Sequence, residues 1–496
     1  MQISPIALSS HQILYEQVAE RLQRLIAEGT LQPGDRLPSV RKLRAQLSVS
    51  TSTVLEAYRL LEDRGLISVR PQSGYYVKQT VLRLPQEPSA TVPPHQACDI
   101  DISLAFQVMN AMRDSTLMQL GAALPAMELL PLAQLNRLMG KVARDNPSLA
   151  HAYGPLLGCP ELRAEFAKRM LDAGCSVPPD QITITNGANE AIFLCLQALT
   201  QPGDTVAIES PTYFAMLEAM KVLGLRALTL PTHPREGISL SHLEEALQAE
   251  PVKACLLVSN FSNPLGSCMG DPKKKRLVEL LNQYDIPLIE DDVYGELYFE
   301  GNRPKALKAF DTEDRVLYCS SVSKTLSPGL RVGWCAGGRY QPQVSRLKSI
   351  LNQNTAMTPQ LTVAAFLANG GYDRHLRHLR RAYHDQTVRM QQAIFDYFPA
   401  ETCVTRPAGG HVLWLEMPAG FEALRLYQEA LEHRITISPG VMFSASGQGY
   451  GNCLRLNTAV PWSAEVEQAM QTLGHLAKKQ LAEQLLSQRE MTVSPS

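Results

Sequence analysis

Five short motifs in the middle of the chain each follow an apolar run and occur in a fixed order between residues 187 and 331. They are a glycine-opened helix start, Asn-Pro, Asp-x-x-Tyr, Ser-x-Ser-Lys and Pro-Gly-x-Arg. The apolar runs at 182–185, 256–259 and 286–289 are typical of buried parallel strands. Because an α/β sheet holds its ligands outside the carboxyl ends of its strands, this order predicts an α/β fold with one site built from the loops that follow.

The segment SVSKTLSPGLRVGW, residues 321–334, contains a lysine with unusual neighbours. Lys324 stands among small hydroxyl residues and precedes a Pro-Gly turn and Arg331. A lysine in a confined site can hold an aldehyde cofactor as an imine, and a phosphorylated cofactor needs hydroxyls and a fixed guanidinium nearby. Ser321, Ser323 and Arg331 would supply these phosphate contacts. An isolated S-x-S-K string is more often a surface lysine in a serine-rich loop, so the interpretation depends on the whole ordered set.

The other motifs add polar groups at neighbouring strand ends. Asp291 ends an apolar run in PLIEDDVYGEL, and Asn263 follows the apolar run upstream, beside a proline turn. In ITITNGANEAIF, a strand over 182–185 leads through Gly187 to a helix that begins near Ala188. The free backbone N–H groups and the positive dipole of such a helix start favour a phosphate.

This ordered set resembles the pyridoxal 5'-phosphate (PLP) enzymes of the aminotransferase class I and II family, over roughly residues 116–480. The resemblance implies a large PLP-dependent transferase fold-type-I domain, with a mostly parallel sheet between helices, and a small C-terminal lobe. It implies that Lys324 forms the Schiff base with PLP, and that Asp291 pairs with the protonated pyridine nitrogen so that the ring acts as an electron sink. Catalysis would depend on these two residues and on Tyr213, in ESPTYF, which would stack on the ring.

The same resemblance assigns the remaining contacts. Asn263 and Tyr294 would bond the phenolic oxygen of the ring, and Tyr153, in HAYGPLLGCPELR, would reach the phosphate from the neighbouring subunit. Arg455, on a short alternating strand in NCLRLN, would hold a substrate carboxylate by a bidentate pair, the alternative being a surface arginine in an ion pair. The groups expected around the phosphate are Gly187, Ala188, Asn189, Ser321, Ser323 and Arg331.

The first 78 residues have the pattern of a winged helix-turn-helix. Apolar residues at helical spacing over 13–28 predict a first helix. Ser39 is placed to cap a second helix and Ser50 a third, and the two are joined by a tight turn. LISVR and YYV then alternate like short strands around the turn PQSG, which predicts a β-hairpin wing with Gly74 at its bend.

This helix-turn-helix predicts which residues meet DNA. Its second helix enters the major groove with its N-terminal residues foremost, and small hydroxyl side chains suit that close approach. Basic side chains before this helix and on the wing would neutralise phosphates. Residues 1–78 carry ten Lys and Arg against seven Asp and Glu, a modest excess that supports DNA binding without deciding it. The predicted DNA-binding residues are Arg36, Ser39, Arg41, Ser50, Thr51, Ser52, Thr53, Arg70 and Gly74.

Residues 31–77 resemble the winged-helix domain of the GntR regulators over the whole length of that segment. Fused to an aminotransferase-like domain, they make the chain similar to the MocR-type subfamily of bacterial transcription regulators over nearly its full length. Members of this subfamily often have a tyrosine two residues after the strand-end Asp, where this chain has Val293 followed by Tyr294. The chain instead keeps the Asp-x-x-Tyr spacing of ordinary aminotransferases.

The length and composition predict several domains. We expect the winged helix over residues 9–78, a linker over 79–115, the aminotransferase-like domain over 116–483 and a disordered tail over 484–496, because 496 residues are too many for one core. The linker begins proline-rich, and its later part has the apolar content to dock on the large domain. No apolar run approaches the roughly 18 residues that cross a bilayer, and no signal-peptide pattern is present, so we expect no membrane partner and a cytoplasmic protein.

The ten cysteines form no C-x-x-C pair and have no His partner at metal-ligand spacing. This distribution argues against a zinc site or a disulfide framework, so we expect no metal. Most of the cysteines are expected to be buried small apolar residues.

Three functions are compatible with this organisation. The resemblance favours a head-to-tail homodimeric regulator that binds a double-stranded DNA operator and whose large domain senses PLP, an amine or an amino acid. The alternative is an active PLP-dependent aminotransferase with an accessory DNA-binding domain, since a sensor and an enzyme would both use Lys324. A dimerisation scaffold without cofactor is disfavoured by the intact set of Asn263, Asp291, Lys324 and Arg331.

Overall fold

The computed structural model describes residues 14–27, 30–31, 34–70, 74–77, 84–93, 96–111, 114 and 116–493, without the side chains of residues 70, 106–107 and 487–493. The chain divides into two compact units, Met1–Arg83 and Leu84–Ser496, which are described separately. No helix in the described ranges combines the length and the apolar character needed to span a membrane.

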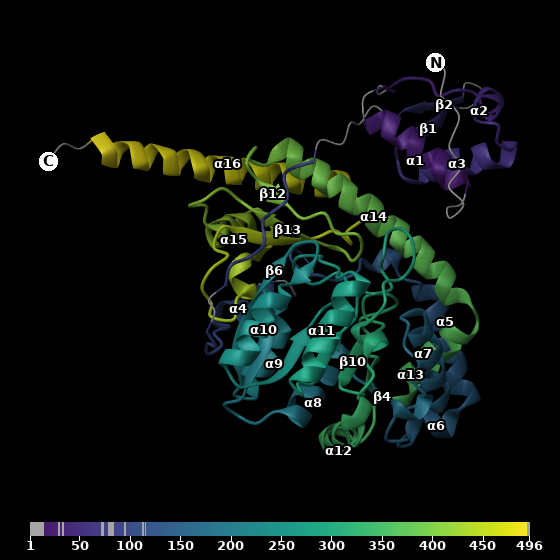
Figure 1. Cartoon of the computed structure of the whole chain (residues 1–496), viewed down its shortest axis with the longest axis vertical. Coiled ribbons are helices and arrows are strands. Elements are labelled where there is room, and N and C mark those ends of the chain that lie inside the picture. Colours follow the sequence, from purple (N-terminus) through teal and green to yellow (C-terminus); the bar gives the residue numbers. More distant parts are fainter. Residues whose placement is uncertain are drawn as a thin grey trace. The chain divides into compact units, whose positions relative to one another are not determined.

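The described part of the N-terminal unit contains three helices and a two-stranded hairpin (Figure 1). Both predicted helix caps form, because Ser39 Oγ accepts from the backbone N–H of Lys42 at 3.3 Å and Ser50 Oγ from that of Thr53 at 3.1 Å. The two strands pair antiparallel as the wing requires, while the turn at 71–73 lies outside the described residues. The elements are α1 (Leu14–Ala27), α2 (Val40–Leu47), α3 (Thr51–Asp63), β1 (Ile67–Arg70) and β2 (Gly74–Val77).

The wing is tied to the helices through the loop between α1 and α2. The backbone N–H of Leu37 donates to Tyr75 O of β2 at 2.9 Å. Tyr58 of α3 is fully buried, and its ring lies 4.6 Å from that of Tyr75 while its hydroxyl donates to Pro38 O at 2.5 Å. The hairpin is therefore held in a fixed position against α3.

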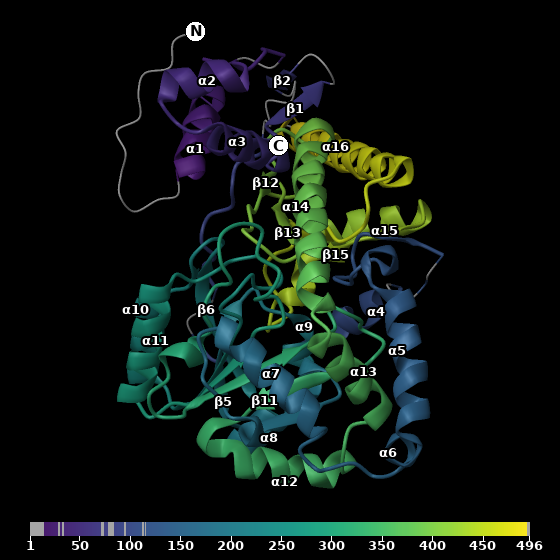
Figure 2. The ribbon, with the colours of Figure 1, turned by 90° about the vertical axis from the view of Figure 1, so that its right-hand side faces the viewer.

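The C-terminal unit is built on an eight-stranded sheet with helices on both faces (Figures 1 and 2). The strand order is β4-β11-β10-β9-β8-β5-β6-β7, and within it β6-β5-β8-β9-β10 form one parallel set. β11 runs antiparallel to both β4 and β10. The strands are β4 (Ile182–Thr185), β5 (Thr205–Ser210), β6 (Arg226–His233), β7 (Gly237–Ile238), β8 (Val252–Leu257), β9 (Leu288–Asp291), β10 (Val316–Ser321) and β11 (Gly333–Ala336).

The helices of this domain include the predicted α8, which begins at Ala188 directly after β4 and Gly187. In both views α10 and α11 lie side by side over the sheet (Figures 1 and 2). Two strand predictions were displaced by a few residues. β9 begins at Leu288 because Pro287 has no N–H to donate, and β8 ends at Leu257 rather than Ser259. The helices are α5 (Leu132–Asp145), α6 (Pro147–His151), α7 (Pro160–Asp172), α8 (Ala188–Leu199), α9 (Phe214–Val222), α10 (Leu240–Ala249), α11 (Asp271–Gln283), α12 (Gln341–Asn352) and α13 (Met357–Ala368).

A smaller lobe carries a four-stranded antiparallel sheet in the order β12-β13-β16-β15. Arg455 lies on a short strand, β16, as predicted, but the expected alternation of buried and exposed residues is wrong, because all five residues of β16 are buried, with β13 and β15 on either side. The long helix α14 runs from α13 to this lobe (Figure 1). The elements are α4 (Ser103–Ala111), β3 (Met118–Gln119), α14 (Gly371–Tyr397), β12 (Cys403–Val404), β13 (Val412–Glu416), α15 (Ala423–Glu432), β14 (Ile435–Thr436), β15 (Ser438–Pro439), β16 (Cys453–Asn457) and α16 (Ala464–Val493).

Two segments that the sequence places outside the domains, the linker from residue 79 and the tail from residue 484, have a defined structure in the described residues. Thr91 Oγ1 donates to Ser210 O at 2.6 Å, and the backbone N–H of Cys98 donates to Ala227 O at 2.9 Å, so this part of the expected linker lies along the large domain. The tail expected to be disordered from residue 484 is helical, since α16 continues to Val493 through a run of strong helix formers. Residues 79–83 and 494–496 lie outside the described residues.

Candidate functional site at the carboxyl ends of the parallel strands

A cavity of 160 Å³ opens where β4, β5, β8, β9 and β10 end. Ten of the residues predicted for the cofactor site line this cavity, together with four that the sequence did not indicate. The predicted ones are Ala188, Asn189, Tyr213, Asn263, Asp291, Tyr294, Ser321, Ser323, Lys324 and Arg331. The additional ones are Leu124, Val258, Val293 and Pro328.

Three residues predicted for the cofactor or the substrate do not line the cavity. Gly187 is the N-cap of α8 and lies next to the lining residue Ala188. Arg455 is buried behind Asn263, to whose Oδ1 it donates at 3.0 Å. Tyr153 is 83% exposed at the surface of the chain, so a contact with a phosphate would require a partner subunit.

Lys324 follows β10, and its ammonium group is inside the cavity. Nζ donates to Ala123 O at 2.6 Å. Burial, assisted by the positive charge of Arg455, lowers the pKa of Lys324 to about 8, although the carboxylate of Asp291 opposes this change. A lysine with this pKa has a substantial fraction of free amine near neutral pH, which is the form that attacks a carbonyl carbon.

Asp291 is the last residue of β9 and is 5% exposed. Burial, followed by the charge of Asp292, raises the pKa of Asp291 to about 7, and its Oδ1 accepts a long hydrogen bond of 3.3 Å from the backbone N–H of Val293. A buried carboxylate in this state gains strongly from a cationic partner, so the geometry suits a protonated ring nitrogen in the cavity.

In the run Glu290-Asp291-Asp292, the middle residue differs in role from the other two, because successive residues of a strand point to opposite faces of the sheet. Glu290 accepts from Ser259 Oγ at 2.8 Å and from the backbone N–H of Leu307 at 2.7 Å. Asp292 forms an ion pair with Arg303 at 2.7 Å. The flanking acids are therefore bound to partners within the domain, and only Asp291 of the three lines the cavity.

The cavity also has the donors that a phosphate needs. Ser321 and Ser323 line it, and the free N–H groups at the start of α8 open onto it at Ala188 and Asn189. Arg331 has a positive φ of 52°, and its Nη2 donates to Asn186 O at 2.7 Å, which fixes the guanidinium beside the helix start.

The close approach of Arg331 depends on a glycine. Gly187 has a φ of 90°, and a Cβ atom built there would lie 2.5 Å from Arg331 Nη2. Any side chain at this position would therefore displace the guanidinium as well as strain the backbone. The combination of hydroxyls, helix start and guanidinium fits a phosphate group.

Arg455 is suited to bind a carboxylate if its present hydrogen bonds to protein oxygens are exchanged for bonds to the ligand. It is 1% exposed, and its Nη2 donates to Ser438 Oγ at 3.0 Å and to Gly121 O. Its Nε has no hydrogen-bond partner among the described residues. Burial lowers the pKa of Arg455 to about 10, which indicates a cation that would gain from an anionic ligand.

Sequence reasoning missed the segment 121–124 and His411. Gly121 and Ala123 contribute carbonyl groups to Arg455 and Lys324, but small residues in a loop give no chemical signal. His411 is fully buried, its ring lies 5.3 Å from that of Tyr294, and burial lowers its pKa to about 3. A pair of glycines before an apolar run was its only sequence signal.

In the N-terminal unit, the residues predicted to meet DNA lie on one short part of the fold. Arg36, Ser39 and Arg41 are exposed around the start of α2, and Ser50 to Ser52 are exposed at the start of α3. Ser50 Oγ lies 2.7 Å from Thr53 Oγ1, so these two hydroxyls are also engaged in the helix cap. Gly74 has a φ of 107° and opens β2, while the side chain of Arg70 lies outside the described residues.

The two units match two protein families. Residues 14–77 match the bacterial regulatory proteins of the gntR family, and residues 126–473 match the aminotransferase class I and II family. The chain belongs to the GntR-type regulators that carry an aminotransferase class I and II domain. This MocR-type regulator is 43% identical to YdcR of Escherichia coli K12, an uncharacterized HTH-type transcriptional regulator, over 94% of this chain and 99% of YdcR.

Solved structures similar to this GntR-type regulator are aminotransferases that cover its large domain. LysN, the α-aminoadipate aminotransferase of Thermus thermophilus in complex with N-(5'-phosphopyridoxyl)-L-leucine, is 31% identical, with a TM-score of 0.70 over 77% of this chain and 100% of LysN. The kynurenine aminotransferase of Pyrococcus horikoshii is 28% identical, with a TM-score of 0.72 over 77% of this chain and 96% of that enzyme.

Proposed function

We propose that this regulator binds PLP in the strand-end cavity through Lys324, and that its large domain thereby senses PLP, an amine or an amino acid. The observation that supports the proposal is that Lys324, Asp291 and donors suited to a phosphate line one cavity of a chain that also has a GntR domain. Bound PLP supplies an aldehyde that binds amines covalently and a ring that withdraws electrons.

The chain's own residues divide the work of binding. Lys324 offers an amine of lowered pKa to the aldehyde, and Asp291 offers a carboxylate to the ring nitrogen. Tyr213 would stack on the ring, while Asn263 and Tyr294 would bond its phenolic oxygen. For an amino acid, Arg455 would exchange its bonds to Asn263 and neighbouring oxygens for the carboxylate of the ligand.

The remaining elements of the proposal concern assembly and location. The regulator would act as a head-to-tail homodimer on a double-stranded operator, with Tyr153 reaching the phosphate of the partner subunit's site. The exposure of Tyr153 supports this arrangement, since its ring makes little contact within its own chain. We further propose a cytoplasmic location, a winged helix over 9–78 and an aminotransferase-like domain over 116–483.

An active aminotransferase is the second candidate function. It is favoured by Lys324 and Asp291 in the cavity and by Arg455 next to the lining residue Asn263, because an enzyme needs no additional charged residue to bind an amino acid and PLP. With PLP and an amino acid bound, turnover would in addition require a base that moves a proton, and Lys324, whose lowered pKa favours the free amine, would be that base. Release of a keto acid distinguishes this function from sensing.

Binding to DNA tests the sensing proposal directly. The affinity of the PLP-loaded protein for its operator would be measured with and without each member of a panel of amino acids and amines. At least one compound is expected to change the affinity of the wild-type protein and to leave that of Lys324→Ala unchanged. Equal responses of both proteins, or no response to any compound or to PLP, would contradict sensing through this lysine.

Gly187→Ala should weaken PLP binding by about 10- to 150-fold, which corresponds to the loss of about 1.5–3 kcal/mol when a charged hydrogen-bond donor is displaced. The reason is the 2.5 Å contact that the new Cβ would make with Arg331. Gly203→Ala is the matched control, since Gly203 has a φ of 94° and nothing within 4 Å of its Cβ position. Titration of both variants with PLP measures the effect, and equal losses would assign it to backbone strain alone.

Arg41→Ala should weaken binding to DNA of any sequence and reduce the slope of log affinity against log salt by about 1. Arg41 is exposed in the first turn of α2, where a guanidinium can reach a phosphate. Arg276→Ala serves as the control, because it removes the same charge from an exposed position on α11, in the other unit. A salt slope that Arg41→Ala leaves unchanged would remove Arg41 from the phosphate contacts.

A further inference from the structure

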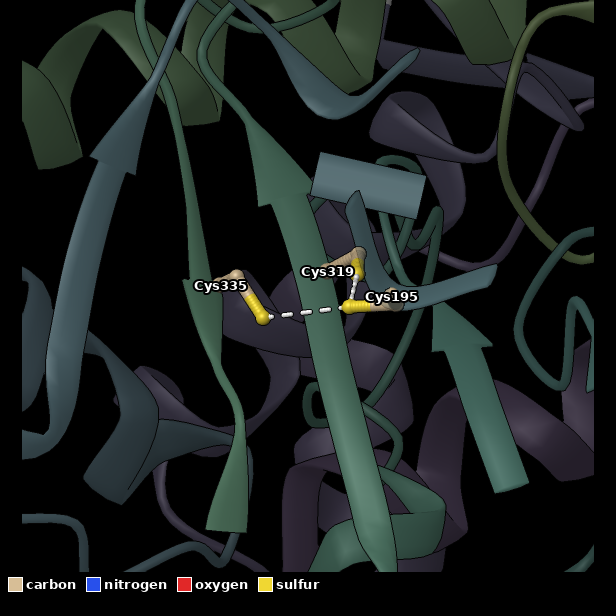
Figure 3. Close-up of side chains that lie close together, drawn as sticks. All are labelled: Cys195, Cys319 and Cys335. Atoms are coloured by element: carbon tan, nitrogen blue, oxygen red, sulfur yellow. Dashed lines mark hydrogen bonds between the residues drawn. The ribbon is translucent and has the colours of Figure 1, made fainter. Parts of the chain in front are cut away.

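Three cysteine thiols from distant parts of the sequence meet inside the large domain (Figure 3). Cys195 Sγ of α8 lies 3.6 Å from Cys319 Sγ of β10 and 3.4 Å from Cys335 Sγ of β11. All three sulfur atoms lie within 4.8 Å of one another, and all three cysteines are free thiols. Across the described ranges, no other group of three His, Cys, Asp or Glu side chains is close enough to share an ion.

The architecture fixes this cluster. Cys319 and Cys335 are directly opposite each other in the antiparallel β10–β11 pair, and α8 packs over both strands. The three side chains are fully buried among apolar residues such as Leu317 and Ile208. The site therefore offers three sulfur ligands and no oxygen or nitrogen ligand from a fourth His, Asp or Glu within the described part of the chain.

Charge decides which ligand such a site can accept. Three thiolates around a monovalent copper ion carry a net charge of −2, and around a zinc ion −1, which is costly in an apolar core without a counter-ion. A trivalent centre bound to three thiolate sulfurs is neutral. We propose that Cys195, Cys319 and Cys335 form a binding site for a trivalent thiophilic metalloid of the arsenite class.

The binding step conserves charge and atoms. Arsenous acid carries three hydroxyl groups, and each S–H group condenses with one of them, so that three As–S bonds form, three As–O bonds break and three water molecules leave. No electron is transferred and no net proton is released. Burial raises the pKa of the Cys195 and Cys319 thiols, so both enter the reaction as S–H groups. Hydrogen bonds from these two thiols lower the pKa of Cys335, and where Cys335 reacts as a thiolate, the hydroxide that it displaces takes one proton from solvent and leaves as the third water.

The distances support a pyramidal centre. With metal–sulfur bonds of about 2.3 Å, a planar three-coordinate centre needs sulfurs about 4 Å apart, and a pyramidal centre brings them closer. Two of the three separations, 3.4 and 3.6 Å from Cys195, lie on the shorter side, and Cys319 Sγ and Cys335 Sγ lie within 4.8 Å of each other. Trivalent arsenic keeps a lone pair and is therefore pyramidal.

Occupation of this site would link three elements that also form the strand-end cavity. α8 begins at the phosphate-binding helix start, β10 leads to Lys324, and β11 follows Arg331. One atom bonded to all three would restrain them relative to one another and raise the midpoint of thermal unfolding.

Arsenite binding to the reduced full-length protein tests this proposal. Native mass spectrometry should show one arsenic atom per chain, as an increase in mass equal to one arsenic atom minus three hydrogen atoms. X-ray absorption should show three sulfur neighbours of the arsenic and no oxygen neighbour. Cys195→Ser and Cys319→Ser should lose the bound arsenic. Cys255→Ser should retain it, since Cys255 is equally buried in β8 and lies outside the cluster.

Three results would overturn the proposal: a wild-type protein that excludes arsenite, fewer than three sulfur neighbours, or arsenic retained by Cys195→Ser. The X-ray absorption measurement needs only the wild-type protein, so it decides the coordination even if the serine variants fail to fold.

Discussion

Lys324→Ala is expected to abolish covalent attachment of PLP. Borohydride reduction of the PLP-loaded wild-type protein should fix one cofactor per chain on the peptide that contains Lys324, and the variant should show none. The reason is that Lys324 is the one lysine among the described residues that line the cavity, and burial lowers its pKa to about 8. Attachment in the wild-type protein should become faster as the pH rises through about 8, because only the free amine attacks the aldehyde.

Lys305→Ala is the matched control for this experiment. Lys305 is 52% exposed and 3.4 Å from Asp271, away from the cavity lining, so the variant should keep full attachment. Attachment that persists in Lys324→Ala would show that Lys324 is not the cofactor-binding residue. A wild-type protein without any attached cofactor would show the same.

Asp291→Asn should have opposite effects on cofactor binding and on stability. It removes one partner of a buried ion pair with the ring nitrogen, so PLP should bind at least about 100-fold more weakly. Without cofactor, the same change removes an unpaired buried carboxylate, which should stabilise the protein at pH 8 by at most about 4 kcal/mol. Equilibrium titration with PLP and unfolding of the cofactor-free proteins measure the two effects.

The pH dependence of this stability difference follows from the direction of the pKa change. The pKa of Asp291 rises on folding to about 7, so between about pH 4 and 7 the native state binds more protons than the unfolded state. The wild-type protein should therefore lose stability as the pH rises through this window, and the gain from Asp291→Asn should grow from near zero at pH 4 to its full value above pH 7. A pH-independent difference would contradict the buried, ionisable state of Asp291.

Local features of the fold were predictable because neighbouring residues determine them. Ser39 and Ser50 cap the helices that follow them, and Gly187 opens α8 as the sequence indicated. Strand bounds were less accurate where one residue interrupts a run, as Pro287 does before β9. The end of α16 was missed because helix propensity outweighed the polar composition of the tail.

Candidate site residues were predictable where each motif ends a strand, since parallel strands bring their carboxyl ends together. Contacts that depend on packing between distant segments were not. The burial of Arg455 results from its place between β13 and β15, and the carbonyl of Ala123 reaches Lys324 across 201 residues. The thiol cluster joins residues 124 and 140 positions apart, so rules on local cysteine spacing could not detect it.

The large domain of this regulator is proposed to bind PLP and to sense an amino compound. The most direct test of this function is the visible absorption spectrum of the PLP-loaded protein during titration with a panel of amino acids and amines, with keto acid assayed in the same samples. We predict that at least one compound shifts the spectrum to a new stable form without accumulation of keto acid. A spectrum that no compound changes, or a shift accompanied by catalytic release of keto acid, would contradict the account.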